Sequence, residues 1–179
     1  MATSITTGTW TLDPTHTEIG FTVRHLMSKV RGKFETFEGI VTTGDSVADA
    51  AVEVSVDLSS INTGTADRDN HLRSSDFFEV ETHPTMTFRS TDVLEKSEGQ
   101  LVVRGELSIK GVTRPIELDV ELLGEGPDPW GGTRIGVEAT GELSRKEFGI
   151  DFNIPVQGDK LMIGDRIALA ITAEAVLQS

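Results

Sequence analysis

The sequence contains neither cysteine nor tyrosine in its 179 residues. Without cysteine the chain has no disulfides, no thiolate nucleophile and no cysteine-ligated zinc. Its large aromatic residues are eight phenylalanines and two tryptophans, so few bulky rings are available to fill an interior. No stretch of about 18 apolar residues occurs either, and no transmembrane helix is predicted.

Basic residues are also few. Lysine and arginine number 16 against 29 aspartates and glutamates, which gives a formal net charge of −13. Such a charge argues against binding to nucleic acids and disfavours adsorption to an anionic membrane, because both depend on cations. The first ten residues, MATSITTGTW, form neither a basic n-region nor an apolar h-region, so we expect no secretory signal and a cytoplasmic location.

Apolar and polar residues alternate with a period of two along most of the chain, which is typical of strands with one buried face. The alternating runs cover residues 19–26, 33–43, 52–58, 85–90, 101–110, 116–122, 134–143 and 167–175. Turn sequences such as TTGD, KSEGQ and GEGPDPWGG separate neighbouring runs and indicate an antiparallel meander. We therefore expect one all-β domain over residues 1–179, with eight strands that form a barrel or a sandwich.

The apolar faces of these runs carry many small side chains. An eight-stranded barrel is just wide enough to be filled by side chains or to hold one ligand. Small residues on long strands favour the ligand, in a cavity that would be long, narrow and apolar. The residues that we expect to line this lumen are Phe21, Val23, His25, Val54, Val56, Met86, Phe88, Val103, Leu107, Leu118, Val120, Val137, Ala139, Leu169 and Ile171.

His25 is the polar member of that set. It shares the face of Ile19, Phe21 and Val23, near the end of its strand. One interpretation is a histidine that donates a hydrogen bond to a nearby backbone carbonyl. The alternative is a polar anchor for the head group of a ligand at the open end of the barrel.

One segment interrupts the alternation. TADRDNHLRSSDFFEVETHP, residues 65–84, concentrates two histidines with several carboxylates and arginines. The i, i+4 spacing of Asp67 with His71 and of Asp69 with Arg73 indicates a short helix over about 66–74. Thr65 or Asp67 is the expected cap, and the charged side chains are expected to pair with one another.

This segment also has the residue types of a reaction centre. However, His71 and His83 stand twelve residues apart without an HxxxH or HExxH pair, and no GxSxG motif occurs. We therefore predict neither a metal site nor a catalytic residue. Phe77 and Phe78 are expected to plug one end of the barrel.

Four stretches resemble the YceI family: WTLDPTHTEIGFTVRHLMSKVRGKFETFEG (10–39), INTGTADRDNHLRSSDFFEVETHPTMTFRS (61–90), VRGELSIKGVTRPIEL (103–118) and RKEFGIDF (145–152). The resemblance implies a lipocalin-like antiparallel barrel that binds a polyisoprenoid, such as an isoprenoid quinone or a polyprenyl phosphate. It supplies no catalytic residue. In that fold, the segment with Arg68, Asp69, His71, Phe77 and Phe78 closes one end of the barrel.

The sequence thus predicts a non-catalytic carrier or store for a long apolar lipid, without a metal or cofactor other than that ligand. Two alternatives remain open. An enzyme on the same barrel would use His25, His71 or His83 with a carboxylate. A stress or interaction protein would act through its surface, where Ala168, Ala170 and Val176 make the outer face of the last strand apolar and suited to a homodimer.

Overall fold

The alternating runs form strands in the computed structural model, which describes residues 3–156 and 161–179. The strands are β1 (Gly8–Leu12), β2 (Glu18–His25), β3 (Ser28–Phe34), β4 (Phe37–Thr43), β5 (Ala51–Asp57), β6 (Ile61–Asn62), β7 (Thr85–Ser97), β8 (Gln100–Ile109), β9 (Val112–Pro127), β10 (Thr133–Ser144) and β11 (Ile163–Leu177). The helix α1 spans Ala66–Arg73, as expected, and short 3-10 turns cover Pro14–His16, Val47–Asp49, Leu58–Ser60 and Arg145–Phe148. Among the described residues, no helix is long and apolar enough to cross a membrane.

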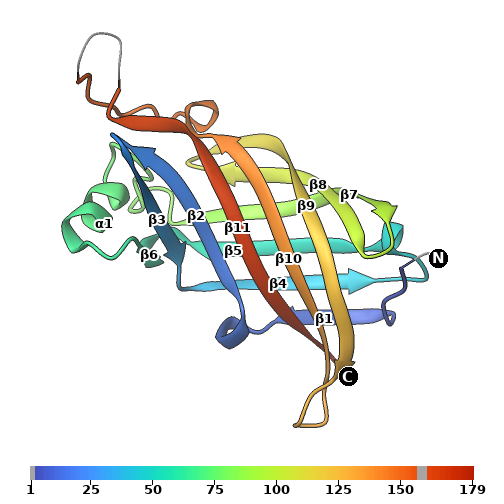
Figure 1. The fold of residues 1–179 in the computed structure, drawn as a ribbon. Coiled ribbons are helices and arrows are strands. Elements are labelled where there is room, and N and C mark those ends of the chain that lie inside the picture. Colours follow the sequence, from blue (N-terminus) through green and yellow to red (C-terminus); the bar gives the residue numbers. More distant parts are fainter. Residues whose placement is uncertain (1–2, 157–160) are drawn as a thin grey trace.

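Within that part of the chain, eight antiparallel strands close into a barrel in the order β1, β4, β5, β7, β8, β9, β10 and β11. The pairing of Trp10 with Leu177 and of Leu12 with Ala175 closes the ring between β1 and β11. Figure 1 shows the long strands β9, β10 and β11 crossing the barrel side by side. The all-β fold expected from the alternation is confirmed, and of the two architectures that the alternation left open, a barrel or a sandwich, the structure has the barrel.

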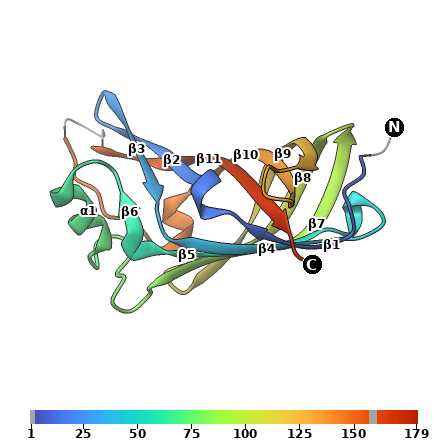
Figure 2. The same cartoon turned by 90° about the horizontal axis from the view of Figure 1, so that it is seen from below.

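The barrel is extended at one end by β2, β3 and β6. The strand β2 pairs with the first part of β11 beyond β1, then with β3, which pairs in turn with β6. Figure 2 shows β3, β6 and α1 together at the end away from both chain termini. The strand β6 is followed by α1 and is the last strand in the pairing order, so the sheet does not close into a ring at this end of the barrel.

One expected strand, 33–43, is wrong as a single element. The chain bends at Glu35 and Thr36, whose backbone N–H groups both donate to the Ser60 hydroxyl, so β3 and β4 pair with different neighbours. The short strand β1 was not expected from alternation. It is separated from β2 by residues 13–17, where Pro14 lacks an N–H donor and the Asp13 carboxylate accepts a hydrogen bond from the Thr15 N–H at the start of the 3-10 turn.

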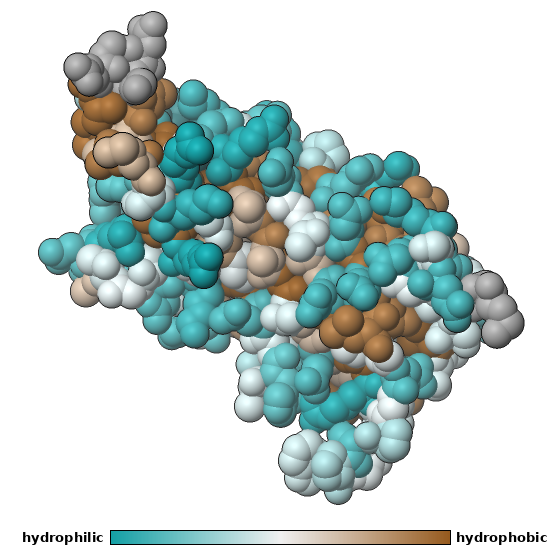
Figure 3. Space-filling model, in the orientation of Figure 1, coloured by the Kyte–Doolittle hydropathy of each residue, from teal (hydrophilic) through white to brown (hydrophobic). Residues whose placement is uncertain are grey.

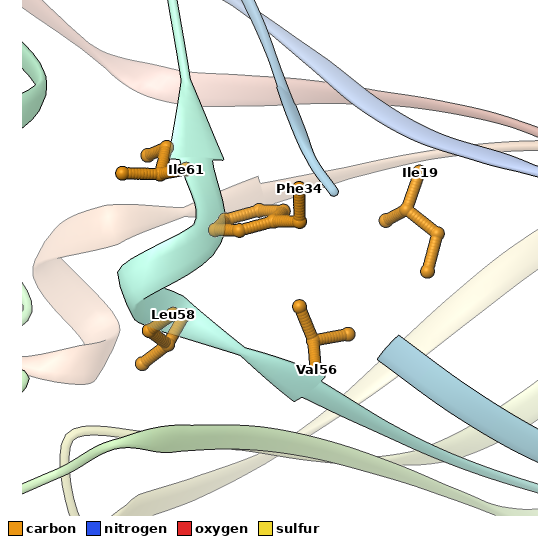
Figure 4. Packing of buried hydrophobic residues seen from close by; sticks show 5 residues of the cluster. All are labelled: Ile19, Phe34, Val56, Leu58 and Ile61. Atoms are coloured by element: carbon orange, nitrogen blue, oxygen red, sulfur yellow. The ribbon is translucent and has the colours of Figure 1, made fainter. Parts of the chain in front are cut away.

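Buried side chains gather around the junction of the ring and its extension. One buried cluster consists of Ile19 from β2, Phe34 from β3, Val56 from β5, Leu58 from the 3-10 turn after β5, and Ile61 from β6 (Figure 4). At the opposite end, the Trp10 ring is fully buried, and its Nε1–H donates to the Thr43 hydroxyl at 3.0 Å. Both ends of the barrel are therefore anchored by packed apolar groups.

An ion-pair network surrounds Arg134 near the Trp10 end. Its guanidinium contacts Asp13 at 2.6 Å, Asp128 at 2.8 Å and Glu174 at 3.3 Å. The His16 ring also lies 2.8 Å from the Asp13 carboxylate. The hydrogen bonds from His16 and Arg134 lower the pKa of Asp13 from 3.8 to about 2.

Asp13→Asn is expected to remove a pH-dependent contribution to stability. A carboxyl whose pKa is lowered by folding stabilises the protein above its unfolded pKa of 3.8, and this contribution disappears as the pH falls through about 2. The expected loss at neutral pH is about 1–2 kcal/mol. Chemical denaturation should show a flatter stability curve between these two pH values, whereas Asp119→Asn, at an exposed pair with Lys96, should leave the curve unchanged.

Candidate functional site: an apolar cavity along the barrel

A cavity of about 220 Å³ lies inside the ring of strands. We call it the ring cavity. Its wall is aliphatic, with Phe88 as its aromatic member and Thr17 and Thr43 as its polar members among the described lining residues. The expected lumen residues that line it are Val54, Val56, Met86, Phe88, Val103, Leu107, Leu118, Val120, Val137, Ala139, Leu169 and Ile171.

A second cavity, of about 290 Å³, lies at the end formed by β2, β3 and α1, and we call it the helix-end cavity. Phe21, Val23 and His25 line it, as do Arg68, His71, Phe77 and Phe78 from the α1 segment. All the expected lumen residues therefore line one of the two cavities. Most of the segment expected to close the barrel also lines the helix-end cavity.

The two cavities share the side chains of Met86, Leu143 and Leu169. These three residues lie at the boundary between the helix-end cavity and the ring cavity. Methionine and leucine are flexible apolar side chains, and methionine in particular adapts to irregular spaces. The cavities thus adjoin along the barrel, with an apolar constriction between them.

The charged side chains of α1 do not pair as expected. Asp69 is buried and accepts a hydrogen bond from the backbone N–H of Thr63 at 2.9 Å, which fixes the chain entering the helix. Arg73 donates to the carbonyls of Ser59 and Ile61. The expected Asp69–Arg73 ion pair is therefore wrong, because both groups satisfy backbone groups of the preceding loop.

Other contacts of this segment also differ from the expectation. Thr65 precedes the helix without a capping hydrogen bond from its side chain, and Asp67 lies in the first turn. His71 pairs with Asp76 at 2.9 Å and not with Asp67. The Arg68 guanidinium donates to the Thr63 hydroxyl and carbonyl, so it is held along the cavity wall.

The ring of His71 belongs to an aromatic cluster at the end of the helix-end cavity. It meets Phe77 and Phe152 edge-on, with centroids 5.0 and 4.9 Å away, and these two phenylalanines lie 5.3 Å from each other. Such edge-to-face contacts are favourable beyond the area that they bury. Phe77 and its neighbours therefore close the cavity, and the Asp76 carboxylate fixes the orientation of the His71 ring.

Arg145 was missed by the sequence analysis, although RKEFGIDF contributed to the family resemblance. Its side chain is 4% exposed and borders the helix-end cavity. The guanidinium donates to the carbonyls of Ile150, Phe152 and Gly164 at 3.0, 2.8 and 2.9 Å. Burial lowers the pKa of Arg145, although an arginine remains protonated in proteins.

His25 and His83, the other two histidines considered as catalytic candidates, lie in different parts of the structure. His25 lines the helix-end cavity at the end of β2, whereas His83 lies against Gly111 on the β8–β9 turn. Within residues 3–156 and 161–179, no group of three His, Asp or Glu side chains is placed to hold a metal ion. The expected absence of a metal and of a catalytic residue remains a prediction.

A closed antiparallel barrel with an elongated apolar interior defines a lipocalin-like class of protein. The chain belongs to a particular family within that class, the YceI-like domain family, which matches residues 10–175. A UPF0312 protein of Vibrio cholerae is 42% identical over 137 residues, which cover 75% of this chain and 72% of that protein. The family expected from the sequence motifs is confirmed.

Two solved structures have the same fold. The YCEI protein of Campylobacter jejuni aligns with a TM-score of 0.73 and 28% identity, over 87% of this chain and 90% of that one. A polyisoprenoid binding domain from Saccharophagus degradans aligns with a TM-score of 0.69 and 18% identity, over 97% of this chain and 100% of that one.

Proposed function

We propose that this protein binds a long apolar lipid of the isoprenoid type and carries or stores it without chemical change. The observation that carries the proposal is the pair of adjoining apolar cavities, which share Met86, Leu143 and Leu169 along the barrel. Together they fall within the volume range of about 300–1,000 Å³ that is usual for ligand sites. Their elongated arrangement suits a flexible hydrocarbon chain better than a compact substrate.

Burial of the hydrocarbon chain is the main favourable contribution to such binding. Burying roughly 400 Å² of lipid chain at about 25 cal/mol/Å² contributes about 10 kcal/mol. Ordering the chain and removing water from its head group subtract a large part of this. A Kd of 1 μM corresponds to about 8 kcal/mol, so submicromolar binding requires polar contacts to the head group in addition to burial of the chain.

The distribution of polar lining residues supports one orientation of the ligand. The hydrocarbon tail would occupy the ring cavity, whose wall is almost entirely apolar. The head group would lie in the helix-end cavity, near His25, Thr63 and Arg68. An isoprenoid quinone or a polyprenyl phosphate satisfies both conditions, and the fold is shared with the polyisoprenoid binding domain named above.

Organic extraction of the purified protein followed by mass spectrometry tests the proposal. We expect a stoichiometric lipid whose fragments differ by isoprene units. Elemental analysis of the same preparation should find no stoichiometric metal. About one zinc or iron per chain that is lost in His71→Ala would contradict the carrier and favour an enzyme.

A further inference from the structure

An apolar lip borders the helix-end cavity on the outside of the barrel. We define it by Leu26, Met27, Ile154, Val156 and Leu161. Met27 is fully exposed, and the other four side chains are 43–49% exposed. Figure 3 shows the corresponding apolar region at the upper left, where β2 ends and β11 begins.

Backbone hydrogen bonds join the two segments of the lip to each other and to the cavity. The Leu26 N–H donates to the Met162 carbonyl at 2.8 Å, and the Met162 N–H donates to the Ile154 carbonyl at 3.0 Å. Met162 and Ile154 themselves line the helix-end cavity. The lip is therefore part of the cavity's rim.

The residues at the tip of the lip are unusual for their position. Leu26 and Met27 form a two-residue turn between β2 and β3, in which Leu26 has a φ of 55°. Turns of this length strongly favour asparagine, aspartate or glycine, because these residues tolerate positive φ. Exposing two large apolar side chains to water costs free energy, and contact with an apolar phase would remove that cost.

Cations gather on the outer face of the same hairpin. Arg24, Lys29, Arg31 and Lys33 are all exposed within ten residues that contain no acidic residue. Arg24 and Lys29 are direct cross-strand partners, an arrangement that is destabilising for like charges. The ion pairs of the described residues use other cations, namely His16, His71, Lys96, Arg104, Arg134 and Arg166.

We propose that the lip and this basic face dock the protein onto an anionic lipid bilayer. The lip would enter the interface while the cations contact the lipid phosphates, which is the pattern of peripheral membrane binding. The net charge of −13 argues against adsorption only if the charge is evenly spread. Charges farther from the surface than about 8 Å are largely screened at physiological ionic strength, so the local cations determine the interaction.

Vesicle flotation tests the proposal. The protein should bind phosphatidylcholine vesicles that contain about one-third phosphatidylglycerol, and it should bind pure phosphatidylcholine much more weakly. Arg24→Gln with Lys29→Gln should weaken binding to the anionic vesicles about tenfold to thirtyfold, because each cation near the surface contributes about fivefold. High salt should have the same effect as this double substitution.

A second variant removes the apolar side chains at the tip of the lip, Leu26 and Met27, and is designed to preserve the fold. Leu26→Asn places a residue that tolerates positive φ at position 26, and Met27→Gly places one that accepts either sign of φ at position 27, so the melting temperature should not fall while vesicle binding drops about tenfold or more. Trp130→Ser is the matched control, because Trp130 is exposed on the β9–β10 turn at the far end of β11 and its loss should not affect binding.

Because the chain lacks cysteine, Met27→Cys can carry a single environment-sensitive dye. Its emission should shift to the blue with anionic vesicles, and that of a labelled Trp130→Cys should not.

Equal binding to both kinds of vesicle, no binding, or a dye shift caused by raising the protein concentration alone would overturn the proposal. The lipid extracted from the Leu26→Asn, Met27→Gly protein is measured separately, so a failure of docking is distinguished from a failure of lipid carriage.

Discussion

Replacing Ala139 with tryptophan is expected to leave the barrel folded while most of its bound lipid is lost. Ala139 is a small side chain in the middle of β10, buried opposite Ile171 and Val120, and it lines the ring cavity. In a filled core, such an insertion typically costs about 1–3 kcal/mol and sometimes more. In a cavity of about 220 Å³, the indole ring can occupy space that the lipid tail would otherwise fill.

The neighbouring residue on the outer face provides the control. Glu138 is exposed on the same strand, so Glu138→Trp should retain the lipid and melt close to the wild type. Lipid content by mass spectrometry and melting temperature should be measured on both variants. If Ala139→Trp unfolds the chain, the interior behaves as a packed core and the carrier proposal fails.

The sequence predicted the barrel wall well because alternation reports directly on which face of a strand is buried. Along β8, for example, Leu101, Val103, Leu107 and Ile109 are buried as their parity predicts. The strand bend at Glu35 and Thr36 could not be predicted in this way. It depends on the Ser60 hydroxyl, which is distant in the sequence and comes close only in the fold.

The closing end of the barrel was predicted less completely. Spacing on α1 predicted its position correctly, but the partners of Asp69 and Arg73 are backbone groups outside the helix, which local spacing cannot reveal. Arg145 was missed for a related reason. A single arginine after an amphipathic strand is usually exposed, and its burial follows from four carbonyls that the fold directs toward one point.

Arg145→Ala should be among the most destabilising single substitutions in this chain. The guanidinium bonds to carbonyls of the segment after the 3-10 turn (Ile150 and Phe152) and to carbonyls at the start of β11. Its loss would leave buried carbonyl groups without donors, and we expect a decrease of about 3–5 kcal/mol in the free energy of unfolding. Because Phe148, Ile150 and Phe152 line the helix-end cavity, the retained lipid should decrease as well.

Arg145→Lys tests whether geometry or charge matters at this position. Lysine keeps the charge, but its ammonium group cannot reproduce the planar fork of donors, so it should recover less than half of the lost stability. Arg166→Ala is the matched control on β11, because Arg166 is exposed and its pair with Glu142 contributes at most about 1 kcal/mol. Urea denaturation of the three variants gives the comparison. If Arg145→Ala unfolds at the same urea concentration as the wild type, water replaces the guanidinium at these carbonyls, and Arg145 does not hold the cavity's end in place.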